Sequence, residues 1–203
     1  GQPFPYDPGP KVLCPSCIAE PPPFDRARAA FAYDDHSRRL VLALKHADRQ
    51  HGLGAFGQWL ARAGSELLAE ADIVAPIPLH WTRLFARRFN QSAMLAQAAL
   101  AANAKATSVA EAKAGHAPPR FEPLLLTRHK RTPPQGRRSR RGRAANVQGA
   151  FRLSAGMDVK GRRILLIDDV LTTGATIAEC ARVLRRAGAA RVDVLTLARV
   201  IRD

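Results

Sequence analysis

The spacing of apolar residues is clearest near the C-terminal end of the chain. Residues 164–167 (ILLI) form a continuous apolar run of strand length, as expected for a central parallel strand that is covered on both faces. The acidic residues Asp168 and Asp169 follow directly and are expected to end the strand. This segment is therefore predicted to lie in the middle of a sheet.

The residues that follow predict a helix and then a further strand. Apolar residues recur at three and four positions and predict a helix over 176–187, with Gly188 as its C-terminal cap. A final strand is predicted over 191–200. Strand, tight turn, helix and strand make a βαβ unit, and such units imply a parallel sheet flanked by helices. The predicted fold class is therefore α/β with a central, mainly parallel sheet.

Upstream, the apolar pattern predicts shorter elements and divides the chain into two parts. The expected elements are a helix that Ser37 caps, a helix over 56–67, a strand over 73–75 and a helix over about 92–102. Residues 1–25 are rich in proline and lack apolar periodicity, so they are predicted to form a small, irregular N-terminal module. Residues 26–203 are predicted to form the α/β domain.

Length and composition agree with one domain and a small appendage. The chain has 203 residues, of which 46% are apolar. No apolar run approaches the roughly 18 residues of a membrane-spanning helix, so no membrane insertion is expected. The cysteines Cys14, Cys17 and Cys180 do not make the even set of a secreted disulfide framework and favour a reducing, cytoplasmic location. Because the sequence begins without methionine, a targeting signal removed from this end would not be visible.

The formal net charge of +15 is concentrated in one segment. Residues 128–143 (RHKRTPPQGRRSRRGR) contain eight Lys and Arg residues and no acid. Such a run repels itself, so a flexible basic loop is predicted at about 127–147 that becomes ordered when an anion binds. Phosphate, pyrophosphate and nucleic acid are all candidate partners by charge. Aromatic residues make up 6% of the chain and none interrupts the run, which argues against stacking on nucleic-acid bases within it.

The predicted strand end carries the residue types of a sugar phosphate site. Ligands of open α/β sheets bind at the carboxyl ends of the strands, where Asp168 and Asp169 are expected. The next helix is preceded by hydroxyl-bearing and small residues, namely Thr172, Thr173, Gly174, Ala175 and Thr176. Helix-start amides and threonine hydroxyls favour a phosphate, and adjacent carboxylates accept hydrogen bonds from a diol. Together these groups indicate a ribose 5-phosphate.

Two other interpretations of the run ILLIDD are the acidic strand of a P-loop NTPase and a buried strand with an acidic end. A P-loop NTPase needs the pattern G-x-x-x-x-G-K-[S/T], which does not occur in this sequence. The whole segment 164–176 (ILLIDDVLTTGAT) is similar to the PRPP loop of type I phosphoribosyltransferases. The resemblance implies that Asp168 and Asp169 hold the ribose 2′- and 3′-hydroxyls and that residues 172–176 hold the 5-phosphate.

Three further segments resemble the ComF/GntX family of phosphoribosyltransferase-like proteins, some members of which are linked to DNA uptake in natural transformation. The first segment is APIPLH at 75–80, followed by Arg83 and by RFNQ at 88–91, and it looks like V-P-V-P-L-H…R-G-F-N-Q of that family. Arg88 stands where the common pattern has glycine. The resemblance implies a pyrophosphate-binding loop made by Pro76, Ile77, Pro78, Arg88 and Gln91. The alternative is a proline turn that ends a strand.

The second segment, residues 131–151, is similar to the family pattern R-x-T-x-x-Q…R-x-x-N-V-x-G-A-F. A related stretch closes over the active site of amidophosphoribosyltransferases, so the resemblance implies a lid that orders on pyrophosphate. Its candidate site residues are Thr132, Gln135, Arg143 and Asn146, with Arg143 in a catalytic role. The alternative is a solvated basic loop. The third segment is the helix end that contains Lys45, where a site role and a solvated lysine are equally open.

The family resemblance implies a transferase that displaces pyrophosphate from PRPP with Mg²⁺, through an oxocarbenium-like centre. The acceptor, an amine or a nucleobase, cannot be identified from the sequence, although residues 26–70 would supply the wall that recognises it. Whether the chain catalyses this transfer stays open. The alternative function is a non-catalytic module that senses a nucleotide or binds single-stranded DNA or proteins of the uptake machinery.

The pair Cys14 and Cys17 matches the second of two C-x-x-C pairs with which family members commonly begin. The resemblance implies half of a zinc finger, since the first pair is absent and a closed structural zinc site needs four ligands. The expectation is therefore that an N-terminal piece was removed or never included, and that Cys14 and Cys17 hold zinc only if missing residues or nearby histidines complete the ligand set. Cys180 falls inside the predicted helix and is expected to be a buried core thiol.

Overall fold

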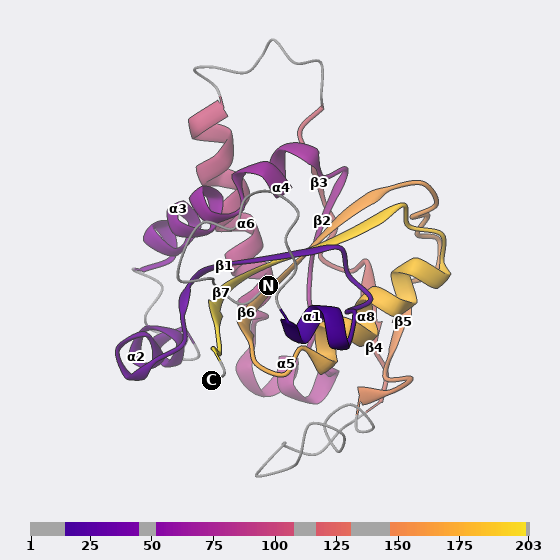
Figure 1. The fold of residues 1–203 in the computed structure, drawn as a ribbon, viewed down its shortest axis with the longest axis horizontal. Helices are drawn as coiled ribbons and strands as arrows, with labels where there is room; N and C mark the ends of the chain where they lie inside the picture. Colours follow the sequence, from indigo (N-terminus) through magenta and orange to yellow (C-terminus); the bar gives the residue numbers. More distant parts are fainter. Residues whose placement is uncertain (1–14, 45–51, 108–116, 131–146, 202–203) are drawn as a thin grey trace.

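The computed structural model describes residues 15–44, 52–107, 117–130 and 147–201 of the chain. A five-stranded sheet forms the centre, and its strand pairings are all parallel. In spatial order the strands are β1 (Arg26–Ala32), β7 (Arg191–Arg199), β6 (Arg163–Leu171), β2 (Ile73–Pro76) and β3 (Arg120–Phe121). All five carboxyl ends therefore lie along one edge of the sheet (Figure 1).

Helices cover both faces of this sheet (Figure 1). One face packs against α3 (Leu53–Ala63), α4 (Ser65–Glu70) and α6 (Gln91–Thr107), and the other against α8 (Ala175–Arg186). Along β6, Ile164 and Leu166 join the apolar cluster that contains α8, whereas Leu165 and Ile167 join the cluster of α3 and α6. Successive strand residues face opposite sides, so β6 has to be apolar at each of these positions. The predicted parallel sheet between helical layers is confirmed.

A second, two-stranded antiparallel sheet is made by β4 (Leu126–Arg128) and β5 (Phe151–Leu153). The buried ring of Phe151 joins the cluster of α8. Antiparallel pairing of β4 with β5 brings the two ends of the intervening segment together, and that segment contains most of the basic run. Residues 131–146 lie outside the described part of the chain.

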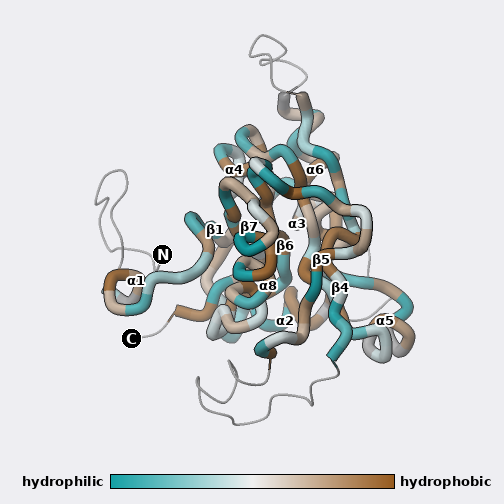
Figure 2. Tube along the Cα trace, turned by 90° about the vertical axis from the view of Figure 1, so that its right-hand side faces the viewer, coloured by the Kyte–Doolittle hydropathy of each residue, from teal (hydrophilic) through white to brown (hydrophobic). Residues whose placement is uncertain are grey.

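Three further helices complete the described elements. They are α1 (Pro15–Ala19), α2 (Asp35–Ala43) and α5 (Trp81–Arg87). α5 lies at the margin of the molecule and carries hydrophobic positions there (Figure 2). None of the helices in the described residues is long and apolar enough to cross a membrane. The division into residues 1–25 and 26–203 stays a prediction, since residues 1–14 are not described.

The structure corrects two details of the predicted helices. Ser37 is not the N-cap of α2, because that position belongs to Asp34: its Oδ1 accepts a hydrogen bond from Ser37 N at 2.7 Å, and Ser37 Oγ accepts one from Asp34 N at 2.8 Å. This reciprocal pair is a capping box, in which both residues contribute. The predicted helix over 56–67 is two helices that meet at Gly64. A Cβ on Gly64 would come within 2.6 Å of the Leu195 side chain, so this junction packs directly on β7.

The structure also corrects two details of the strands. β6 does not end at Asp168 but continues to Leu171, with Asp168 opposite Thr196 and Val170 opposite Ala198 in β7. β1 was not predicted, because its sequence RARAAFA mixes arginine with alanine and shows no clear strand pattern. Its pairing partner, β7, lies far away in the chain.

At the amino edge of the sheet, Asp72 joins the start of β2 to the start of β6. Its carboxylate accepts hydrogen bonds from Arg163 N at 2.7 Å and from Arg163 Nη2 at 2.6 Å. Hydrogen bonds from Arg163 lower the pKa of Asp72 from 3.8 to about 2. A carboxyl group with a lowered folded-state pKa stabilises the fold above its unfolded pKa and loses this effect as the pH falls through the folded value.

We expect Asp72→Asn to lower the free energy of unfolding at neutral pH by about 1–2 kcal/mol, because the ion pair is lost while the side chain keeps its size. The loss of stability between about pH 4 and pH 2 should be shallower in the variant. Urea unfolding at a series of pH values measures both effects. Asp35→Asn, at an exposed position in the first turn of α2, is the control. A loss of stability between about pH 4 and pH 2 that is as steep in the Asp72 variant as in the parent would contradict this role.

Candidate functional site

The turn between β6 and α8 forms a small hollow at the carboxyl edge of the sheet. Gly174 is the N-cap of α8 with a φ of 74°, a left-handed conformation that glycine adopts without strain. The hollow measures about 50 Å³, and its lining includes Asp168 and the whole turn 172–176. The first amides of a helix have no partner within the helix and carry a partial positive charge. The turn therefore presents backbone donors to an anion.

Hydroxyl groups add to these backbone donors. Within the described residues, the side-chain hydroxyls of Thr172, Thr173 and Thr176 form no hydrogen bond. Threonine hydroxyls and helix-start amides at one position suit a phosphate monoester. The structure thus brings together all five residues that the sequence assigned to the phosphate.

The two acidic residues are placed differently. Asp168 lines the hollow, and its Oδ1 accepts hydrogen bonds from Ser92 Oγ at 2.8 Å and from Asp169 N at 3.0 Å. Asp169 is half-buried beside it, but it is not among the lining residues, and its Oδ1 accepts a hydrogen bond from Val170 N at 2.7 Å. The carboxylate of Asp168 is therefore the one that faces the phosphate turn.

The segment at and just after the end of β2, residues 76–79, is called the proline loop here and lies next to this carboxylate. Ile77 N donates to Ile167 O at 2.9 Å, so the loop stays paired with β6 up to the residue before Asp168. Pro76, Ile77 and Pro78 are all buried. Their side chains are thus part of the packed core, and only the loop's backbone polar groups can meet a ligand here.

Two residues of the site were not predicted from the sequence. Asn90 donates from Nδ2 to Ile77 O at 3.1 Å and accepts from Ser92 N at 3.0 Å, so one side chain joins the proline loop to the start of α6. Ser92 then donates to Asp168. An asparagine just before a helix is a typical N-cap signal, but the contact between Ser92 and Asp168 spans 76 positions and leaves no local pattern.

Gln91 and Arg88 were both predicted to bind pyrophosphate. Gln91 is 3% exposed, and its Nε2 has no hydrogen-bond acceptor among the described residues. A buried amide donor without an acceptor is costly, so a ligand acceptor would stabilise it. Arg88 is exposed and ends α5 with a φ of 63°, the single described non-glycine residue with positive φ. Arginine thus occupies a backbone position that suits the glycine of the family pattern.

Both ends of the basic segment are attached near the phosphate turn. At one end, Arg128 forms a backbone bridge with His80, the residue after the proline loop, and its guanidinium lies 5.3 Å from the centre of the Phe151 ring. At the other end, Gly149 N donates to Glu179 Oε1 at 2.8 Å. Glu179 is a buried carboxylate in the second turn of α8. The segment therefore leaves and rejoins the domain beside the candidate site.

Several predicted site residues belong to parts of the chain that the structure does not describe. Thr132, Gln135, Arg143 and Asn146 lie outside the described residues, as do Lys45 and Cys14. Cys17 is half-buried in α1. Within the described parts of the chain, no three His, Cys, Asp or Glu side chains are close enough to hold a metal ion. Zinc at Cys14 and Cys17 therefore stays a prediction.

Cys180 is a core residue, as expected. It is fully buried in α8, and burial raises the pKa of its thiol well above 9.0. The neutral thiol is thus the stable form, and Cys180 serves packing rather than chemistry.

Comparisons with known proteins identify the family to which the chain is similar. A family model described as "Phosphoribosyl transferase domain" matches residues 106–203. The chain is 32% identical over 194 residues to "DNA utilization protein YhgH" of Escherichia coli (strain K12), covering 93% of this chain and 78% of that protein. It is 30% identical over 164 residues to "Competence protein F" of Haemophilus influenzae, covering 80% of this chain and 59% of that protein.

Solved structures are more distant. The glutamine PRPP amidotransferase from B. subtilis, complexed with ADP and GMP, matches with 22% identity and a TM-score of 0.43. That match covers 71% of this chain and 26% of the amidotransferase, so the chain spans about a quarter of its length.

We expect Arg88→Gly to raise the free energy of unfolding by about 1 kcal/mol, because glycine removes the cost of a Cβ in a left-handed conformation. Arg88→Ala removes the same charge but keeps a Cβ, so it should give no such gain. Urea unfolding of the two variants at equal ionic strength measures the difference. Equal stabilisation by both substitutions would assign the effect to charge rather than to the backbone.

Proposed function

The chain belongs to the ComF/GntX family of phosphoribosyltransferase-like proteins, and on that premise we propose that it binds PRPP with Mg²⁺ at the carboxyl edge of its sheet. We further propose that it transfers the phosphoribosyl group to an amine or nucleobase and releases pyrophosphate. The observation that carries the proposal is the hollow between Asp168 and the turn 172–176. One wall accepts hydrogen bonds from a sugar diol, and the other donates hydrogen bonds to a phosphate.

The surroundings of this hollow supply groups for the pyrophosphate. Gln91, with its unsatisfied buried Nε2, starts the helix that also carries Ser92, the partner of Asp168. The ends of the basic segment flank the same edge through Arg128 and Gly149. Arginines near a pyrophosphate offset its charge and bind it in a bidentate manner. We assign Thr132, Gln135, Arg143 and Asn146 to this part of the ligand, with Arg143 acting on the leaving group.

Magnesium fits the donor set at this edge. Mg²⁺ prefers oxygen ligands, and proteins usually hold it with one or two carboxylates together with substrate phosphates. Asp168 and Asp169 provide such carboxylates beside the proposed phosphoribosyl site. The metal would neutralise the charge that develops on the departing pyrophosphate.

Single-stranded DNA is a second candidate ligand, favoured by the surface of α5. Trp81 is 68% exposed and Phe85 is 84% exposed, whereas large aromatic residues are usually covered. The backbone bridge from His80 to Arg128 places the start of α5 beside the basic segment, which continues through the exposed residue Lys130. Exposed aromatic rings next to cations are the two parts of a surface that stacks bases and binds their phosphates.

We expect PRPP with Mg²⁺ to stabilise the protein against thermal unfolding, by about 2.7 kcal/mol at a ligand concentration one hundredfold above the Kd. Asp168→Asn should remove most of this shift, Asp169→Asn less of it, and the double substitution all of it. Asp158→Asn, at an exposed acidic residue elsewhere, is the control. Differential scanning fluorimetry measures the shifts, and pyrophosphate release with a panel of amines and bases measures turnover.

A parent protein without any PRPP-dependent shift would contradict the proposed binding site. A shift that is present while pyrophosphate release is absent across a broad panel would contradict the transferase reaction and favour a sensing module. Unfolding temperatures of the variants without ligand show whether each substitution leaves the fold intact.

For the second ligand, we expect Trp81→Ala and Phe85→Ala each to weaken binding of a fluorescent oligothymidine by about 1–3 kcal/mol, the usual contribution of one stacked base. Leu124→Ala, at an exposed but aliphatic position, should have little effect. Fluorescence anisotropy at several salt concentrations measures the affinities. Affinity that does not fall steeply with salt, or that survives both aromatic substitutions, would rule out this surface.

A further inference from the structure

The hydroxyl of Ser92 belongs to a closed ring of hydrogen bonds around the end of β6. Ser92 Oγ donates to Asp168 Oδ1 at 2.8 Å, and Ser92 N donates to Asn90 Oδ1 at 3.0 Å. Asn90 Nδ2 donates to Ile77 O at 3.1 Å, and Ile77 N donates to Ile167 O at 2.9 Å. Because Ile167 directly precedes Asp168 in the chain, these four hydrogen bonds close on themselves.

The packing of α6 on the sheet places Ser92 over the end of β6. Three fully buried residues follow it at intervals of three, four and seven positions, namely Leu95, Ala96 and Ala99. They belong to the same apolar cluster as Ile167, the residue of β6 before Asp168. Residues at these intervals share one face of a helix. Ser92 therefore lies on the face of α6 that packs against the sheet, where it is 4% exposed.

The start of α6 does not need this hydroxyl. A serine in the first turn of a helix usually bonds to nearby backbone groups. Asn90 has that role here, because its side chain accepts from Ser92 N and its carbonyl oxygen accepts from Ala93 N and Met94 N, each at 3.1 Å. The Ser92 hydroxyl instead donates to a carboxylate 76 positions away in the chain.

Two donors hold one oxygen of the Asp168 carboxylate. Ser92 Oγ and Asp169 N both donate to Oδ1, from separate segments of the chain. Rotation of the carboxylate would break both hydrogen bonds, and hydrogen bonds to a carboxylate are among the stronger ones in proteins. Asp168 lines the hollow with the turn 172–176, whereas Ser92 does not line it. Ser92 can therefore affect a ligand in the hollow only through Asp168.

We propose that Ser92 is a positioning residue, which holds the Asp168 carboxylate in the orientation that accepts a hydrogen bond from a ribose hydroxyl, and that Asn90 fixes Ser92 in place. This inference rests on the proposed function, in which Asp168 binds the sugar. A carboxylate that is fixed before the ligand arrives loses less conformational freedom on binding. Ser92 therefore strengthens recognition of the sugar, whereas the turn 172–176 binds the phosphate without its help.

Two phosphate monoesters separate the sugar contact from the phosphate contact, since ribose 5-phosphate carries the diol and ethyl phosphate does not. We expect Ser92→Ala to weaken binding of ribose 5-phosphate about tenfold and to leave binding of ethyl phosphate unchanged. Isothermal titration calorimetry at equal ionic strength and Mg²⁺ concentration measures both dissociation constants. Ser37→Ala, which changes a buried serine in the first turn of α2, is the control and should leave both constants as in the parent.

A double-mutant cycle tests whether Ser92 acts through Asp168. Asp168→Asn should by itself weaken binding of ribose 5-phosphate, and the addition of Ser92→Ala should cause no further loss. A further loss of about tenfold in the double variant would overturn the positioning role. Ser92→Ala that weakens both ligands equally, or neither of them, would also overturn it. A parent protein that binds both ligands equally well would contradict the proposed function, and the positioning role would fall with it.

Asn90→Ser provides a second variant. Serine keeps a capping oxygen for the start of α6, but its side chain is too short to donate to Ile77 O as Asn90 does. Loosening the ring at this point should weaken binding of ribose 5-phosphate about threefold and leave binding of ethyl phosphate unchanged. Equal dissociation constants in this variant and the parent would overturn the part of the proposal that concerns Asn90.

Discussion

The parallel pairing of β6 with β2 and β7 is the interaction on which the rest of the structure depends. Because helices cover both faces, β6 has to be apolar from Ile164 to Ile167, and its polar groups can appear only where that cover ends. Parallel strands also end along one edge of the sheet. The proline loop after β2 and Phe31 near the end of β1 therefore lie at the same edge as Asp168. The sheet thus decides which residues can share a ligand.

The parts of the fold that could be predicted from the sequence are those in which local pattern and tertiary environment agree. The run from Ile164 to Arg199 has strong apolar periodicity, and its strands and helix occur within a few residues of their predicted bounds. β6 extends beyond the acidic pair because its pairing with β7 continues there, and backbone pairing is not visible in side-chain pattern. β1 was missed for a related reason: it is formed by its pairing with β7, not by its own composition.

The candidate site divides in the same way. The turn 172–176 is contiguous, so the sequence alone could predict that its five residues lie together before α8. Ser92 and Asn90 act across the fold, one on Asp168 and the other on the loop at Ile77, and no spacing in the sequence indicates either contact. Glu179 is similar, because its role follows from where the basic segment rejoins the domain. Contacts between distant segments depend on how the whole chain folds, so no local pattern in the sequence indicates them.

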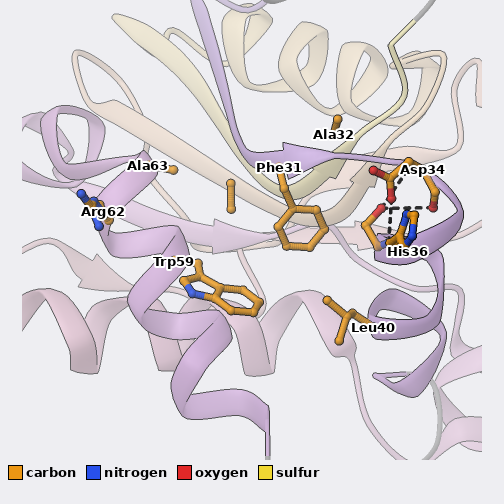
Figure 3. A pocket seen from close by; sticks show the side chains of 10 residues that line it. Phe31, Ala32, Asp34, His36, Leu40, Trp59, Arg62 and Ala63 are labelled. Carbon is orange, nitrogen blue, oxygen red and sulfur yellow. Dashed lines mark hydrogen bonds between the residues drawn. The ribbon is translucent and has the colours of Figure 1, made fainter.

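The contrast between a contiguous turn and contacts across the fold also matters for ligand specificity under the proposed function. A phosphate and a ribose diol are the same in every PRPP molecule, so a single short segment with fixed residue types can recognise them. A cavity of about 620 Å³, lined by Phe31, Asp34 and Trp59 among others, is formed by β1, the start of α2 and α3, whose residues are not adjacent in the sequence (Figure 3). One strand, β7, lies between the end of β1 and the end of β6, where the turn before α8 begins. The turn before α8 and the neighbouring cavity are therefore formed by separate segments that the sheet brings to one edge.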